Sequence, residues 1–162
     1  MGISYPPLIR TKIVTLTNAQ IKALPTTGVE IVPAPGDGKV LVLVGGVYCL
    51  TTTVAYTNIH ANAILFMGGS FNFFEVSSYL PAGSSGFLQA TSNQWATVTP
   101  NNPLRDMGGG VYVTQERWDS VSDIANTPYK LYAQNYGSGN FTGGDAGNSL
   151  KVTVRYMIED LP

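Results

Sequence analysis

The sequence predicts an all-β protein: a single β-sandwich, jelly-roll-like, with one short helix near the N-terminus. First, 18 glycines and 10 prolines separate short runs of β-branched and aromatic residues, which is typical of sandwiches and barrels. Second, only one segment carries both a start and a stop signal for a helix. Third, 162 residues without a composition break or a long repeat suit one domain. We therefore expect a single domain over residues 9–162, preceded by an extended N-terminal arm over residues 1–8.

The N-terminal arm contains the run Tyr5, Pro6, Pro7 and Leu8. Proline has no amide hydrogen and restricts the residue before it, so this segment cannot begin a helix or a central strand. A stiff, extended, apolar arm loses little conformational entropy when it docks. We expect these four residues to contact a partner, and a frayed terminus is the alternative.

The predicted helix runs from Thr17 to Leu24. Thr17 as N-cap and Gln20 at the third helical position form a capping box, and Pro25 ends the helix because it restricts the residue before it. Two helical turns are not stable alone. Ile21 and Leu24 are therefore expected to pack against one end of the sandwich.

The next segment predicts a β-hairpin. Residues 29–32 and 39–53 flank the Asp-Gly pair at 37–38, which favours a tight turn. Residues 40–44 do not alternate in polarity, so both faces of this strand are expected to be covered by the core and by another element or subunit. The Gly-Gly pair at 45–46 predicts a β-bulge.

Further strands are expected at residues 63–67, 71–76, 110–115 and 129–135. Long loops are expected over residues 77–126, because periodicity is weak there and turn residues are frequent. The last strand, over residues 150–158, alternates clearly between apolar and polar residues. It is predicted to be half-buried and central.

Composition and charge exclude several partners. Charged residues make up 12% of the chain and the net charge is −1, so no strong field attracts nucleic acid. The longest apolar run, residues 40–50, is too short to span a membrane, and the first residues do not resemble a secretory signal. The single Cys49 cannot form an internal disulfide and is predicted to be a small buried hydrophobic residue.

No motif predicts catalysis, a metal or a cofactor. His60 is the only histidine and nothing around it resembles a catalytic triad. Residues 36–40 do not match a phosphate loop, and a Gly-Gly-Asp sequence at 143–145 occurs only once, which favours a flexible hairpin tip over a calcium site. Three acid pairs are candidates for glycoside hydrolysis, but they lack any supporting motif and are interpreted as surface charge: Asp119 with Asp123, Glu116 with Asp119, and Glu159 with Asp160.

Aromatic residues offer two interpretations. They could line a sugar-binding or partner-binding surface, or form core and cross-strand pairs, as aromatic residues usually do in β proteins. The residues concerned are Trp95, Trp118, Tyr112, Tyr129, Tyr132 and Tyr136.

Two segments carry a resemblance. Residues 13–50 contain TLTNAQIKALPTT and EIVPAPGDGK, and residues 139–161 contain GNFTGGDAGNS followed by the last strand. Together, roughly 60 of 162 residues resemble tailed-bacteriophage virion structural proteins, including capsid decoration or cement proteins. The middle of the chain does not take part in this resemblance.

The resemblance implies a non-enzymatic protein that is made in the host cytoplasm and lies on the outer capsid surface of a virion. It further implies a homo-oligomer, with a trimer favoured, that binds the major capsid protein or another virion protein. It brings no catalytic residue, metal or cofactor. The alternatives are a receptor- or carbohydrate-binding module of a phage tail fibre or tail, and a hydrolase.

Overall fold

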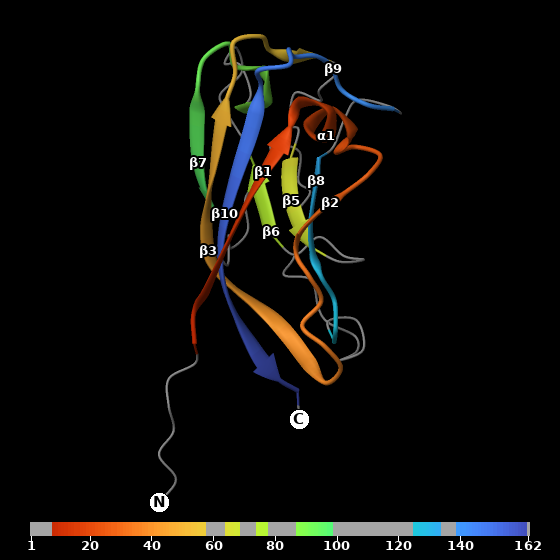
Figure 1. The fold of residues 1–162 in the computed structure, drawn as a ribbon, viewed down its shortest axis with the longest axis vertical. Helices are drawn as coiled ribbons and strands as arrows, with labels where there is room; N and C mark the ends of the chain where they lie inside the picture. Colours follow the sequence, from red (N-terminus) through yellow and green to blue (C-terminus); the bar gives the residue numbers. More distant parts are fainter. Residues whose placement is uncertain are drawn as a thin grey trace, which may run out of the picture.

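The computed structural model describes residues 8–57, 64–68, 74–77, 87–98, 125–133 and 139–161. These residues form antiparallel β-sheets and one α-helix (Figure 1), so the all-β prediction is confirmed. The helices are α1, Asn18–Ala23, and the 3-10 helix η1, Phe87–Gln89. The strands are β1, Arg10–Thr17; β2, Val29–Val32; β3, Lys39–Thr51; β4, Tyr56–Thr57; β5, Ile64–Gly68; β6, Phe74–Ser77; β7, Gln94–Val98; β8, Tyr129–Ala133; β9, Thr142–Gly143; and β10, Ser149–Asp160.

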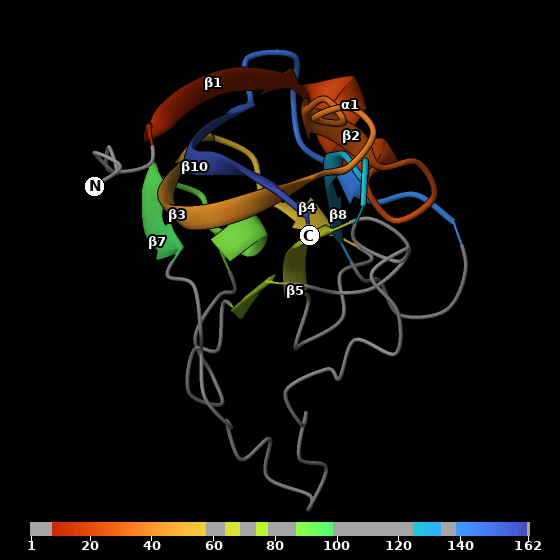
Figure 2. The same ribbon diagram turned by 90° about the horizontal axis from the view of Figure 1, so that it is seen from below.

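Two four-stranded sheets make up most of the fold. One has the order β1-β10-β3-β7 and the other β2-β8-β5-β6, while β4 and β9 form a small third sheet. Figure 2 shows β1, β10, β3 and β7 on one side of the molecule, with β2, β8 and β5 on the other. The pairing between the two halves of the chain is nested: β1 pairs with β10, β2 with β8, β3 with β7, and β5 with β6.

Strand β10 has the central place that its alternation predicts. Leu150, Val152 and Val154 are buried, whereas Lys151 and Arg155 are exposed. β1 and β3 pair with its two edges. The period of two therefore places one apolar row against the core and one polar row outside.

Helix α1 is also where the sequence predicts it. The Gln20 amide donates to Thr17 Oγ1 at 3.4 Å and the Thr17 amide donates to Gln20 Oε1 at 3.0 Å, so the capping box is present. Ile21 and Leu24 are fully buried. Figure 1 places the helix at one end of the two sheets, where these side chains join the core.

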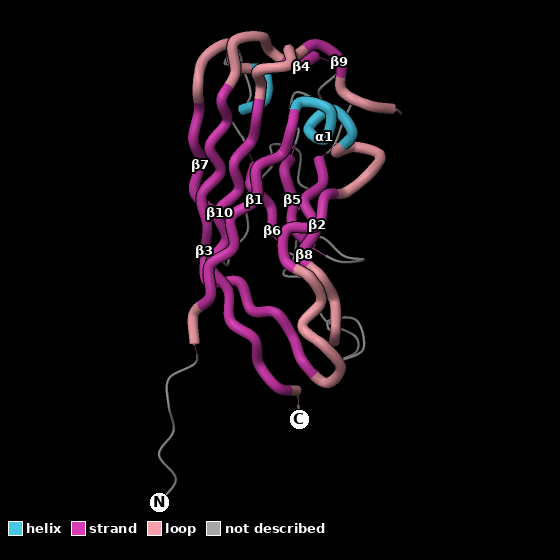
Figure 3. The backbone as a smooth tube through the Cα atoms, in the orientation of Figure 1, coloured by secondary structure: helices cyan, strands magenta, loops and turns pink. Residues whose placement is uncertain are grey.

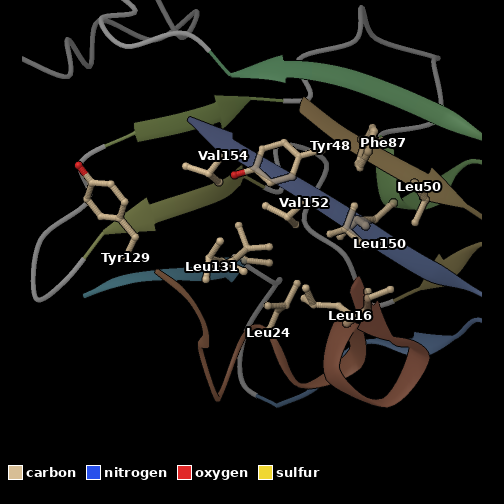
Figure 4. Close-up of a cluster of buried hydrophobic side chains, with 14 of the residues drawn as sticks. Leu16, Leu24, Tyr48, Leu50, Phe87, Tyr129, Leu131, Leu150, Val152 and Val154 are labelled. Atoms are coloured by element: carbon tan, nitrogen blue, oxygen red, sulfur yellow. The ribbon is translucent and has the colours of Figure 1, made fainter. Parts of the chain in front are cut away.

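The core lies between the two large sheets and takes side chains from both. Figure 4 shows Tyr48, Leu50, Val152 and Val154 gathered in one cluster with Leu131 of the opposite sheet. The described buried side chains of the two sheets therefore belong to one apolar cluster.

The bulge prediction is confirmed. The register between β3 and β10 shifts between Arg155, opposite Gly45, and Tyr156, opposite Leu43. Val44 is the extra residue on β3. Beyond this point β3 and β10 continue as a two-stranded ribbon that bends away from the rest of their sheet (Figure 3). In the ribbon the odd-numbered Leu41 is buried and the even-numbered Val42 is half-buried.

The predicted hairpin between residues 29–32 and 39–53 is wrong. β2 pairs with β8, whereas β3 pairs with β10 and β7 in the other sheet. The turn itself exists, since the Lys39 amide donates to the Gly36 carbonyl at 3.2 Å and Gly38 has a φ of 67°. The connection passes from one sheet to the other, and Pro33 and Pro35 within it cannot donate to a β-ladder.

The prediction of loops over residues 77–126 is wrong for η1 and β7. β7 pairs with β3 from Gln94 opposite Leu50 to Val98 opposite Gly46. The sequence of β7, QWATV, does not alternate regularly between apolar and polar residues. Hydrophobic periodicity therefore could not identify this strand. β5 and β8 agree with predicted strands, β6 overlaps one in part, and the strand expected at residues 110–115 lies outside the described residues.

Candidate interaction surface

The outward side of the sheet β1-β10-β3-β7, called the outer face below, consists of side chains arranged in rows. Residues that pair across neighbouring strands point to the same side of a sheet. One row therefore runs Thr15, Lys151, Cys49, Trp95; the next runs Ile13, Thr153, Val47, Thr97; and a third contains Thr11, Arg155 and Gly45. Buried residues of the same strands, such as Val152 and Tyr48, occupy the alternate positions.

The outer face exposes two large apolar side chains. Trp95 is 75% exposed and Ile13 is 58% exposed. Cys49 is the neighbour of Trp95 in one row, and Val47 is separated from Ile13 by Thr153 in the next; both Cys49 and Val47 are half-buried. Tryptophan is enriched among the residues that dominate binding energy at interfaces, so the exposed indole makes this face a candidate interaction surface.

Backbone packing holds this face together. Ala96, the neighbour of Trp95, points inward opposite Tyr48 and packs against the core, which directs the indole outward. A β-carbon at Gly46 would lie 2.4 Å from the carbonyl oxygen of Thr153. The glycine therefore allows β3 to approach β10 closely beneath the rows.

The predicted arm residues are only partly within the described structure. Leu8 is 71% exposed and leads through the exposed Ile9 into β1. Tyr5, Pro6 and Pro7 lie outside the described residues. Leu8 and Ile9 thus add exposed apolar side chains next to the edge strand of the outer face.

Cys49 is not in the core, which corrects the expectation of a buried residue. It is half-buried on the outer face, opposite Trp95. The apolar run around it suggested full burial, but its odd position on β3 places it on the side opposite Tyr48 and Leu50.

The Gly-Gly-Asp sequence at 143–145 belongs to a loop held by hydrogen bonds, and it is not the tip of a hairpin because β9 pairs with β4 and not with β10. Asp145 Oδ1 accepts from the amides of Gly147 and Asn148 at 2.9 and 3.1 Å, and its Oδ2 accepts from Thr53 Oγ1 at 2.8 Å. β9 pairs with β4, and Phe141 beside it is buried in the core. The Asp145 carboxylate is therefore engaged by its own chain.

Among the other chemical candidates, Asp160 forms an ion pair with Lys39 at the end of the ribbon. Glu159 is half-buried beside it. Four other candidates lie outside the described residues: His60, Glu116, Asp119 and Asp123. Within the described part of the chain no group of three or more histidine, cysteine or acidic side chains is placed to hold a metal ion.

The aromatic candidates divide. Tyr129 is buried and its hydroxyl donates to the carbonyl of Leu41 at 2.7 Å, so it fastens β8 to the ribbon; burial raises the pKa of the Tyr129 hydroxyl. Tyr132 is half-buried on β8. Of the six candidates, Trp95 alone has a described side chain that is exposed; Trp118, Tyr112 and Tyr136 lie outside the described residues.

In the described ranges, no helix has the length and apolar character needed to cross a membrane.

No protein-family model and no curated protein sequence matches this chain. Among solved structures, it is similar to a chain of the "Cyanophage Pam1 capsid asymmetric unit", with 16% sequence identity and a TM-score of 0.44. The alignment covers 100% of this chain and 91% of that chain. The chain is thus weakly similar in shape to a protein chain from a cyanophage capsid.

Proposed function

We propose that this chain is a non-enzymatic bacteriophage virion structural protein, of the capsid decoration or cement type. In this proposal it forms a homotrimer on the outer capsid surface and stabilises the head by binding the major capsid protein. The observation that carries the proposal is that the two segments resembling virion proteins fold into one unit, and that this unit supplies three of the four strands of the outer face.

The contacts between the two segments are extensive. β1 and β3 come from residues 13–50 with their flanks, β10 comes from residues 139–161, and the three strands are neighbours in one sheet. The Phe141 amide donates to the Lys22 carbonyl at 2.9 Å, and Thr26 Oγ1 donates to Asn140 Oδ1 at 2.5 Å. The two segments that carry the resemblance are therefore far apart in the sequence but adjacent in the folded protein.

The outer face suits a protein that binds a large surface. It exposes Trp95 and Ile13 among threonines, in rows fixed by backbone pairing. A preorganised sheet loses little conformational entropy on docking. In our proposal the arm, through Tyr5, Pro6, Pro7 and Leu8, extends the contact from the β1 edge.

We also propose that the two large sheets form a jelly-roll sandwich. In a jelly roll, eight strands are arranged in two sheets. The nested pairs β1 with β10, β2 with β8, β3 with β7 and β5 with β6 give eight strands in two sheets that share a core.

The test is quantitative mass spectrometry of purified phage particles with the copy number of this chain per virion. We expect many copies, in a number divisible by three, and their loss should lower the temperature at which heads release DNA. A few copies per particle that co-purify with tails would support the alternative, a receptor- or carbohydrate-binding tail module, for which the exposed Trp95 ring could act as a sugar platform. Absence from the particles would contradict both roles.

A further inference from the structure

The basic residues are distributed unevenly over the sheet that carries the outer face. Residues 10–17, 45–51, 94–98 and 149–156 contain four of the nine basic residues of the chain and none of its ten acidic residues. The four are Arg10, Lys12, Lys151 and Arg155, and all are exposed. A net charge of −1 for the whole chain therefore conceals a cationic region.

Two of these cations belong to the outer face itself. Lys151 and Arg155 lie on β10, on either side of the row that contains Ile13, Thr153 and Val47. Asp160, the nearest exposed acidic residue along β10, pairs with Lys39 at the far end of the ribbon. Within the described residues, neither Lys151 nor Arg155 forms an ion pair.

We propose that the outer face binds an acidic, flat protein surface, which places apolar atoms against Trp95 and Ile13 and carboxylates against Lys151 and Arg155. This inference rests on the proposed function and specifies the chemistry of the capsid surface that would be recognised. Opposite potentials on facing surfaces accelerate encounter and fix register, while the tryptophan supplies the buried anchor.

The size of the face indicates how such a contact would be used. Four strands at about 4.8 Å spacing and seven residues at about 3.4 Å rise cover on the order of 450 Å². A standard interface buries about 800 Å² per partner, so one copy of the face gives weak binding. Several copies in one oligomer would reach high occupancy through avidity.

The same features disfavour two other occupants. A second copy of this face would bring Lys151 and Arg155 against another pair of cations, and like charges in an interface are unfavourable. Nucleic acid is bound mainly through phosphate neutralisation, for which two cations set among apolar and threonine side chains are few.

The experiment measures binding of the full chain to purified particles made without it, by co-sedimentation at low and high salt. The test variant is Lys151→Glu with Arg155→Glu. The matched control is Lys22→Glu with Lys130→Glu, which makes the same change in net charge on α1 and β8. Lys151→Gln with Arg155→Gln, which removes the two charges without reversing them, is measured alongside and replaces the test variant where the charge-reversed protein fails to fold by circular dichroism.

We expect the test variant to bind at least tenfold more weakly and the control to bind within twofold of the wild-type protein. Salt should weaken the wild-type protein strongly and the Gln variant only slightly. Wild-type binding that survives charge reversal, with unchanged salt dependence, overturns the inference and leaves the proposed function standing. Failure of the wild-type protein to bind overturns both.

Two parallel measurements test whether nucleic acid or a second copy of this chain binds the outer face instead. In the first, the wild-type protein is titrated with a labelled DNA duplex. If it binds DNA as tightly as it binds particles, and the test variant loses both affinities equally, the inference is overturned in favour of a polyanion. A change of oligomeric state on charge reversal, seen by sedimentation velocity, would overturn it in favour of an interface between copies.

Discussion

Trp95 of β7 lies directly opposite Cys49 of β3, and both side chains are on the outer face. The indole is 75% exposed and the thiol is half-buried beside it. Since Cys49 is the only cysteine, its reactivity can report whether this face becomes covered.

Trp95→Ala is expected to weaken binding to particles by roughly 30-fold, because loss of a central interface tryptophan costs about 2 kcal/mol or more. The melting temperature should change by no more than about 2 °C, since the side chain is largely outside the core. Titration of the variant against particles, followed by co-sedimentation, measures the loss.

Alkylation of Cys49 provides the control for that experiment. Saturating particles should slow maleimide labelling of the wild-type protein, and labelling should return to the free rate with Trp95→Ala at the same concentration. Equal labelling rates with and without particles would show that the contact lies elsewhere.

Thr17→Ala is expected to lower the free energy of unfolding by about 1 kcal/mol, because it removes the N-cap acceptor of the Gln20 amide. For a chain of this length that corresponds to roughly 2 to 4 °C in melting temperature. Thr17→Ser retains the hydroxyl and should remain close to the wild-type value. A Ser variant as unstable as the Ala variant would contradict the capping role.

Two buried tyrosines should respond oppositely to loss of the hydroxyl. The Tyr48 hydroxyl is buried without a hydrogen-bond partner among the described residues, so Tyr48→Phe is expected to stabilise the protein by about 1 kcal/mol. Tyr129 donates to Leu41, so Tyr129→Phe is expected to destabilise it by about the same amount. Urea unfolding of both variants tests the difference, and a shift of the same sign in both would contradict it.

Stability should fall as the pH rises above about 10. Burial raises the pKa of Tyr48 and Tyr129 above the ordinary tyrosine value of about 10. In the unfolded chain these groups ionise near pH 10 while the folded chain keeps them protonated, so folding stability is fully present below about pH 10 and is lost above it. Each such tyrosine makes the free energy of unfolding fall by up to about 1.4 kcal/mol more per pH unit.

The measurement is the urea unfolding free energy from about pH 8 to about pH 11.5, with tyrosinate absorbance recorded in parallel. Tyr48→Phe should make the alkaline loss less steep. A slope unchanged by this substitution would show that Tyr48 ionises without unfolding.

Asn126→Ala is expected to cost about 2 kcal/mol, because two effects combine. Asn126 Nδ2 donates to Asp37 Oδ1 at 2.9 Å and its Oδ1 accepts from the Gly36 amide at 3.0 Å, so the side chain holds the turn before β3. Its φ of 51° lies in the left-handed region, which asparagine adopts more readily than alanine does. Asn126→Gly removes only the side-chain bonds and should cost less than Asn126→Ala; the reverse order in thermal melts would contradict this.

Features set by local signals could be predicted from the sequence. The capping box of Thr17 with Gln20 and the alternation through Leu150 to Val154 each depend on residues close along the chain, and both are present. The Asp-Gly turn at 37–38 is likewise a turn. Its interpretation as the turn of a hairpin was wrong because the strand that pairs with β2 is β8, about a hundred residues later in the sequence.

The outer face could be predicted only in part. Trp95 was recognised as a binding candidate from its chemistry. Its neighbours in the rows come from β1, β3 and β10, and which residues share a row depends on register between distant strands. Register is decided by burial of one face of each strand in the folded protein, which a single sequence does not reveal.

The nested pairing also determines when the protein can fold during synthesis. β10 is synthesised after all the other strands that the structure describes, yet β1 and β3 both need it as their neighbour in the sheet. A nascent chain that ends before residue 149 therefore holds two apolar strands with no common partner, a state prone to aggregation. Completion of the sheet must follow emergence of β10, so folding is dominated by contacts between distant parts of the chain.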